Sequence, residues 1–174
     1  AACDKYSCDA NGNGATTSGA ALAISQHTTK KDIRVTVNGG TFNGVKAISE
    51  SNPQENDPAP LVDLSVNDGT FNGEITSADC KDFIKAGTFS SDPTAYVGSK
   101  AIYKKDNKFY VGTAPAHSNG MNAWVKGDDG LYTETYVAPA PDPEPEKNPI
   151  TNSGSASSGD ALTKVDASDS TTSS

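Results

Sequence analysis

The chain has 174 residues, which is enough for one modest domain with accessory segments. Its formal net charge is −8, and an acidic surface repels phosphate backbones, so we expect no nucleic-acid partner. Hydrophobic residues make up only 34%, which predicts a thin core or segments outside it, and no apolar run approaches the roughly 18 residues that a membrane-spanning helix needs.

The first 18 residues are small and polar, without a hydrophobic period. Within them, Asp9–Gly14 matches the opening of a calcium-binding loop. That loop requires a bidentate Glu at its twelfth position, where this chain has Ala20. We therefore interpret the stretch as a turn, and we predict no metal and no other cofactor.

The chain contains three cysteines, Cys3, Cys8 and Cys80. An odd number argues against a complete disulfide framework. A single bridge between Cys3 and Cys8 and a chain with only free thiols both remain open. The chain begins at Ala1 without Met, which fits either a mature secreted protein or a part of a longer one.

A short phrase, Gly-Thr-Phe, occurs three times, at residues 40–42, 69–71 and 87–89. Two alternating runs, Ile33–Val37 and Val62–Val66, precede the first two copies, and alternation of this kind is typical of a strand with one buried face. A chain of hairpins would also fit the turn residues. Stacked coils are favoured because the repeats align as ladders, the clearest of which joins Phe42, Phe71 and Phe89. We predict an all-β chain, a short right-handed parallel β-helix with C-terminal β-hairpins.

Other parts of the coils are less regular. The two Ala-Ile-Ser phrases start 24 residues apart, at residues 23 and 47, and lie in stretches that resemble each other, with 73–77 as a third counterpart. Residues 51–60 carry Pro53, Pro58 and Pro60 and are interpreted as a loop inserted between coils. The coils are predicted to extend over residues 1–89. When the third coil is aligned with the others on its glycine, Asp82 occupies the position of Val35 and Leu64. We therefore expect a bulge or a register shift there, with Cys80 facing inward.

Residues 90–138 are predicted to cap the coils and then form hairpins. Asp92 is expected to cap a helical turn with Pro93 at its first position, followed by Tyr96 and Val97 as a plug. Residues 101–111 and 123–133 each resemble two strands around a polar turn. Residues 139–174 are rich in Pro, then in Ser, Thr and Gly, and are predicted to be a spacer and a disordered tail.

The segment 85–97, followed by 101–111, resembles a module common in secreted surface proteins of gut Gram-positive bacteria. In that module, Gly-Thr-Phe closes a right-handed parallel β-helix, and a Ser-Asp-Pro-x-x-Tyr-Val phrase and a hairpin follow. The resemblance implies an extracellular or cell-surface location and an adhesin-like role, without catalytic residues. The stretch Asn148–Asn152 also resembles a sortase signal, but an anchor would need a hydrophobic segment and a basic tail after Asn148–Thr151. Unless the chain is part of a longer one, we interpret the stretch as a chance match.

Few residues suggest chemistry. The nearest carboxylate cluster is expected to be a solvated outer face, with Asp63 beside Arg34; its members are Asp63, Glu74, Asp79 and Asp82. His27 and His117 are predicted to be exposed loop residues. Aromatic side chains concentrate after the coils, and they are candidate ligand contacts: Tyr103, Tyr110, Trp124 and Tyr132. The alternative, which we favour, is that they form the small core of the hairpins.

From the sequence we predict a non-catalytic extracellular protein, structural or adhesin-like, that presents loops from a β-solenoid. A glycan or protein of a host or cell surface is the candidate partner. Two other classes stay open. One is a fragment of a β-helix that binds or cleaves polysaccharide, and the other is a module of a phage tail fibre.

Overall fold

The computed structural model describes residues 7–8, 17–59 and 61–146. The chain divides into two units, Ala1–Pro139 and Ala140–Ser174. In the second unit, residues 140–146 contain no helix or strand and are exposed, as the prediction of a spacer requires. The rest of the predicted tail lies outside the described residues, as do the stretch Asn148–Thr151, the stretch Asp9–Gly14 and Cys3.

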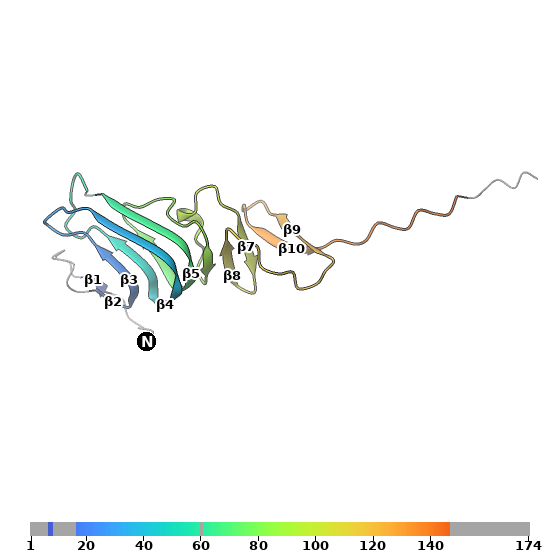
Figure 1. Ribbon diagram of the computed structural model, residues 1–174, viewed down its shortest axis with the longest axis horizontal. Coiled ribbons are helices and arrows are strands. Elements are labelled where there is room, and N and C mark those ends of the chain that lie inside the picture. The colour runs from blue at the N-terminus through green and yellow to red at the C-terminus, as the bar shows by residue number, and fades with distance from the viewer. Residues whose placement is uncertain (1–6, 9–16, 60, 147–174) are drawn as a thin grey trace, which may run out of the picture. The chain divides into compact units, whose positions relative to one another are not determined.

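The first unit is all-β and contains a β-solenoid of about 4 turns, which confirms the predicted parallel coil architecture. Its successive turns pair in parallel, and Figure 1 shows them side by side. The strands of the turns are β3 (Ala20–Ser25), β4 (Ile33–Ser51), β5 (Val62–Ser77) and β6 (Gly87–Phe89). A separate antiparallel pair is formed by β1 (Ser7–Cys8) and β2 (Thr17–Ser18).

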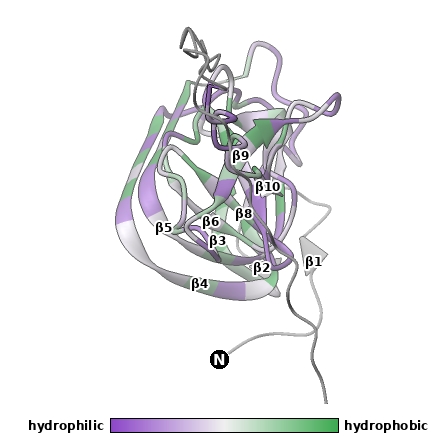
Figure 2. Cartoon of the chain, turned by 90° about the vertical axis from the view of Figure 1, so that its right-hand side faces the viewer, coloured by the Kyte–Doolittle hydropathy of each residue, from purple (hydrophilic) through white to green (hydrophobic). Residues whose placement is uncertain are grey.

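The interior of the solenoid is built from ladders of like residues. Val35 pairs with Leu64 and Val37 with Val66, as predicted. The ring centroids of Phe42 and Phe71 are 4.9 Å apart, and the same distance separates Phe71 from Phe89, with all three rings nearly parallel. Figure 2 shows β4 bending around this interior. Stacking is possible because each repeat returns the same side chain to the same corner.

The register between the first two turns does not follow the two Ala-Ile-Ser phrases. Leu22 pairs with Ile48, and Ile24 pairs with Glu50, so the two Ala-Ile-Ser phrases are offset by two residues and do not stack. A shift of two residues leaves every side chain on its original face, which is why the alternation did not reveal it. In addition, β4 continues through Ser51, so the inserted loop begins at Asn52.

The last turn forms no continuous strand before β6, in the region where a bulge or a register shift had been predicted. Val66 and Ile84 still form a parallel bridge, so the register survives at that position. Before it, Asp82 has a φ of 52°, and the chain turns Phe83 inward in its place. Cys80 is buried as predicted, with its thiol 3.4 Å from the carbonyl oxygen of Val62.

A cap follows the last turn. The 3₁₀ helix spans Thr94–Tyr96, and Asp92 accepts a hydrogen bond from the backbone nitrogen of Thr94 at 2.9 Å. Pro93 had been predicted at the first position of a helical turn. It instead immediately precedes this helix. Val97 is 3% exposed, and the hydroxyl of Tyr96 accepts a hydrogen bond from the backbone of Ser77, so the two residues do plug the coil.

Both predicted hairpins are present, and they continue the solenoid sheet. The first comprises β7 (Ile102–Lys105) and β8 (Lys108–Val111), and the second comprises β9 (Asn122–Lys126) and β10 (Tyr132–Tyr136). β8 pairs with β6, and β10 pairs with β7, so eight strands form one sheet in the order β3-β4-β5-β6-β8-β7-β10-β9. The predicted boundary between residues 89 and 90 therefore does not interrupt the sheet.

Candidate binding surface on the hairpin sheet

One face of the hairpin sheet carries a row of tyrosines. Thr88, Tyr110, Tyr103 and Tyr132 are successive partners across β6, β8, β7 and β10, so their side chains emerge on the same face. All four are partly exposed. The residues that alternate with them, such as Phe89, Val111 and Ile102, are buried on the other face. Period-two alternation therefore directs the tyrosines outward.

Three of the four predicted contact residues form one cluster. The ring centroid of Tyr103 lies 5.2 Å from that of Trp124, edge to face, and 5.2 Å from that of Tyr132. Tyr110 stands in the same row but borders a separate depression. The cluster packs against itself, as expected for a hairpin core, and its members still keep part of their surface in solvent. These side chains therefore form a small core and still offer surface to a ligand.

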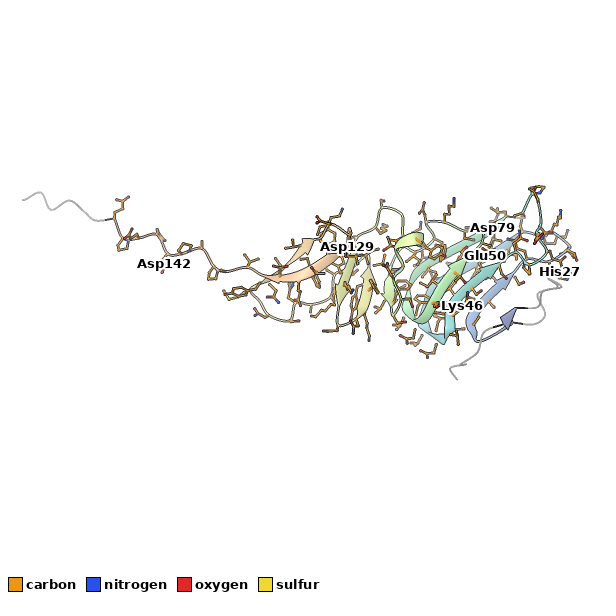
Figure 3. The ribbon with its side chains drawn as sticks, turned by 180° about the vertical axis from the view of Figure 1, so that it is seen from behind. His27, Lys46, Glu50, Asp79, Asp129 and Asp142 are labelled. Carbon is orange, nitrogen blue, oxygen red and sulfur yellow. The ribbon has the colours of Figure 1, made fainter. Side chains whose placement is uncertain are left out.

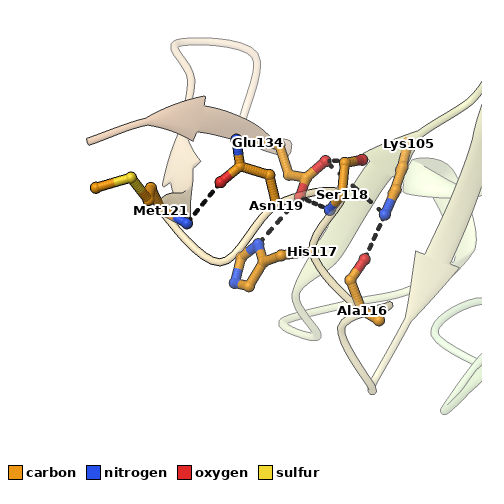
Figure 4. A network of polar contacts seen from close by, with 7 residues as sticks. All are labelled: Lys105, Ala116, His117, Ser118, Asn119, Met121 and Glu134. Atoms are coloured by element: carbon orange, nitrogen blue, oxygen red, sulfur yellow. Dashed lines mark hydrogen bonds and ion pairs between the residues drawn. The ribbon is translucent and has the colours of Figure 1, made fainter. Parts of the chain in front are cut away.

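A polar network anchored on Glu134 fixes this surface (Figure 4). One carboxylate oxygen accepts hydrogen bonds from the Ser118 backbone nitrogen and from His117 Nδ1, the latter at 3.2 Å. The other accepts from the Ser118 hydroxyl at 2.7 Å and lies 3.8 Å from Lys105 Nζ. The Ser118 hydroxyl is the main cause that lowers the pKa of Glu134 to about 2. The network ties the segment before β9 to the sheet.

The same segment is held at two further points. Lys105 Nζ donates a hydrogen bond to the carbonyl oxygen of Ala116. The ring of His117 stacks on Trp124, with centroids 5.2 Å apart. His117 is exposed, as predicted, but sequence reasoning missed its partner Glu134. The only available signal was alternation in β10, which places Glu134 opposite Trp124 on the tyrosine face.

Next to this network lies an open cavity of about 440 Å³. It is bordered by β5, by β6 and the residue before it, by β8 and by the segment that leaves β8. Its lining comprises Asn67, Asp68, Ala86, Gly87, Thr88, Tyr110, Val111, Thr113, Ala114 and Pro115. Of the predicted contact residues, only Tyr110 lines this cavity, and no sequence pattern indicated that residues 67–68 and 113–115 meet there.

The carboxylates considered for catalysis are dispersed or already engaged. Asp63, Glu74 and Asp82 are exposed at separate positions. Asp79 meets Glu50 at the solenoid corner shown in Figure 3, and both accept hydrogen bonds from Gln26 Nε2. Through Gln26, which follows β3, Glu50 in β4 and Asp79 after β5 therefore hold together three successive turns of the coil.

Glu50 is 2% exposed, and its other oxygen accepts three bonds of 2.8 Å, from the Ser77 hydroxyl and the backbone nitrogens of Ala78 and Asp79. A buried carboxylate with this many donors organises the turn after β5. Arg34 and Asp63 are cross-strand neighbours as expected, but among the described residues they do not approach within the 4.0 Å of an ion pair.

The described residues contain no group of three or more His, Cys, Asp or Glu side chains that could hold a metal ion. Nor does any helix in that part of the chain have the length and apolarity needed to cross a membrane.

The inserted loop is fastened to the solenoid, because the Asn56 side chain donates a hydrogen bond to the carbonyl oxygen of His27 and the Leu61 backbone nitrogen donates one to the side chain of Asp32. These contacts leave the hairpin sheet as the better candidate surface.

No family model, no curated protein and no solved structure matches this chain. The resemblance to surface proteins of gut bacteria therefore rests on the phrases in the sequence alone. The β-solenoid fold does not depend on that resemblance, because the structure itself has this fold.

Proposed function

We propose that this chain is a non-catalytic extracellular surface protein, structural or adhesin-like, that presents a hairpin face and loops from a β-solenoid. The observation that carries the proposal is the continuous sheet, which joins the solenoid directly to a face where Tyr103, Trp124 and Tyr132 are partly exposed. Aromatic side chains provide contact area at low cost in conformational entropy, which suits a recognition surface.

The solenoid is suited to a supporting role. Its stacked rings and ladders bury like residues, and the Glu134 network extends this order beyond the cap. Side chains on regular strands are positioned more accurately than side chains on loops. A scaffold of this kind holds an attached face in one orientation.

Two observations favour this role over a carbohydrate-cleaving fragment. Glycoside hydrolysis needs two carboxyl groups on either side of one bond. Asp63, Glu74 and Asp82 are exposed at separate positions, and the carboxylates of Glu50 and Asp79 are bonded to groups of the coil itself. A phage tail fibre would be trimeric, so a monomeric mass from light scattering would count against that alternative.

Adhesion can be tested with beads that carry the purified chain. We expect the beads to attach to a subset of immobilised polysaccharides and extracellular-matrix proteins, without release of reducing sugar ends. A control set of beads carries an unrelated acidic protein of similar size. Release of reducing ends would contradict the non-catalytic proposal, and a failure to attach would leave only the structural role.

A further inference from the structure

We propose that the cavity beside Tyr110 binds one sugar unit of a neutral oligosaccharide, whose following units lie along the tyrosine row. This inference rests on the adhesin-like role proposed above and assigns its ligand class. The cavity, of about 440 Å³, falls within the range of roughly 300–1,000 Å³ that small-molecule sites occupy. It has room for one ring of a sugar chain and stays open at its mouth.

The polar groups around this cavity are the main evidence. Asp68 uses Oδ1 to accept a bond from the Gly69 backbone nitrogen at 2.8 Å, and its Oδ2 has no protein partner within the described chain. The hydroxyls of Thr88, Tyr110 and Thr113 likewise form no hydrogen bond to any described residue. Four polar groups that the fold does not use therefore surround one depression.

The side-chain amide of Asn67, by contrast, is hydrogen-bonded through both its nitrogen and its oxygen. Its amide nitrogen donates to Asn38 at 2.8 Å, and its amide oxygen accepts from Ser65. The amide serves the solenoid ladder and closes one side of the cavity. We therefore assign ligand contacts to the four unused groups and not to Asn67.

The chemistry of the four groups selects the ligand class. Three hydroxyls both donate and accept, whereas the carboxylate only accepts, so the set matches a ligand that has several hydroxyl groups. The lining contains no Lys, Arg or His, and Asp68 would repel an anion. An uncharged sugar satisfies both conditions, whereas a uronic acid, a sialic acid or a phosphate does not.

The tyrosine row gives the direction of a longer chain. Neighbouring strands lie about 4.8 Å apart, which is close to the advance of one sugar unit along an oligosaccharide. Tyr110, Tyr103 and Tyr132 stand on three successive strands. The rings of Tyr103 and Tyr132 pack against each other, so they offer edges and hydroxyls to a ligand instead of a flat stacking surface. Further sugar units would accordingly be held by hydrogen bonds.

The test uses the complete purified chain and calorimetric titration with soluble probes. The neutral probes are hexamers of glucose, mannose and galactose, and hexagalacturonic acid is the acidic probe of the same length. We expect at least one neutral hexamer to bind and the acid to bind at least about tenfold more weakly. Absence of binding by every neutral hexamer, or a preference for the acid, would overturn the proposal.

Variants locate the site. Tyr110→Phe keeps the ring and loses the hydroxyl, and Asp68→Asn removes the charge; each should weaken binding by about tenfold, since each disturbs a hydrogen bond in a partly enclosed site. Tyr136→Phe is the matched control, because Tyr136 is 58% exposed and does not line the cavity. Unchanged far-UV circular dichroism verifies folding. Equal affinity of all three variants for the hexamer would contradict the assigned site.

The outcome is separable from that of the bead experiment. If the beads attach to a protein or an acidic polysaccharide while no neutral hexamer binds, the ligand class assigned here is wrong and the adhesin-like role stands. If a hexamer binds and Tyr110→Phe weakens it, the cavity is supported whatever surface the beads prefer.

Discussion

The carbonyl oxygen of Gly44 lies 2.2 Å from the position that a β-carbon on Gly73 would occupy. Both glycines stand at the corner that follows the Gly-Thr-Phe phrase, and consecutive coils touch there through their backbones. The contact leaves no room for a side chain. It explains why the Asn-Gly corner recurs, since the stacking distance of the coils depends on it.

Replacing Gly73 with alanine should destabilise the solenoid strongly. The new methyl group would clash with backbone, and the residue has a φ of 146°, which alanine rarely adopts. We expect a loss of more than about 3 kcal/mol in the free energy of unfolding. Gly39→Ala is the control, because its φ is 154° but nothing lies within 4 Å of its added methyl. Equal losses in urea unfolding of the two variants would contradict the close-contact explanation.

Truncation of the central ring of the aromatic stack should also be costly. Phe71 is fully buried between Phe42 and Phe89, so Phe71→Ala leaves a cavity and is expected to cost about 3–5 kcal/mol. Phe42→Ala should cost less, because Phe42 is partly exposed. Chemical unfolding followed by far-UV circular dichroism measures both. A smaller loss for Phe71 than for Phe42 would argue against the stack as the centre of the coil.

The buried carboxylate at the solenoid corner provides a further test. Glu50→Leu would leave the Ser77 hydroxyl and the nitrogens of Ala78 and Asp79 without their acceptor, at an expected cost of about 3 kcal/mol or more. Glu50→Gln retains one oxygen acceptor and should cost less. The exposed Glu74→Gln is the surface control, with an expected change within about 0.5 kcal/mol. Similar unfolding midpoints for the Leu variant and this control would refute the role of Glu50.

Acid should loosen the hairpin sheet through Glu134. Its pKa is lowered from 4.5 to about 2 in the folded chain, so the folded state binds its proton less readily than the unfolded state. The stabilisation is therefore complete above about pH 4.5 and is lost as the pH falls towards 2. Trp124 is the single tryptophan and contacts His117, so its fluorescence reports on this region.

In the Glu134→Gln variant, the part of the acid-induced fluorescence change that belongs to this window should disappear. Glu74→Gln, at an exposed position of the solenoid, serves as the control and should retain it. Identical acid profiles for the parent chain and Glu134→Gln would show that another group governs the transition.

Cys80 should be a poorly reactive thiol. Burial, together with the nearby charge of Glu50, raises its pKa above 9.0, so the thiolate is disfavoured in the folded chain. Its contribution to stability is present below about pH 9 and is lost as the pH rises beyond that value. In a Cys3→Ser, Cys8→Ser variant, a disulfide reagent should modify Cys80 slowly at pH 8 and rapidly in urea. Rapid modification in the absence of urea would contradict its buried position.

Much of the solenoid followed from local pattern, and the candidate site did not. The alternation in 33–37 and 62–66 and the three Phe residues were sufficient to predict the ladders, because those features repeat in sequence as they do in space. The offset between Ile24 and Glu50 escaped prediction, since a shift by two residues keeps the same face.

The binding surface depends on contacts between distant segments. Asp68 and Thr113 meet only because β6 pairs with β8, and Ser118 reaches Glu134 only because the segment before β9 folds back over the sheet. No periodicity marks such pairs. The tyrosines themselves could be singled out by composition, but whether they faced inward or outward depended on a register that the sequence did not define.

Surface labelling of intact cells that produce this protein tests the central claim most directly. A membrane-impermeant amine reagent should modify Lys108 and Lys126, which are exposed on the hairpin sheet, without prior lysis. We predict that mass spectrometry finds both lysines labelled to the same extent in intact and lysed cells, with a cytoplasmic protein labelled only after lysis. Labelling of these lysines only after lysis would contradict an extracellular surface protein.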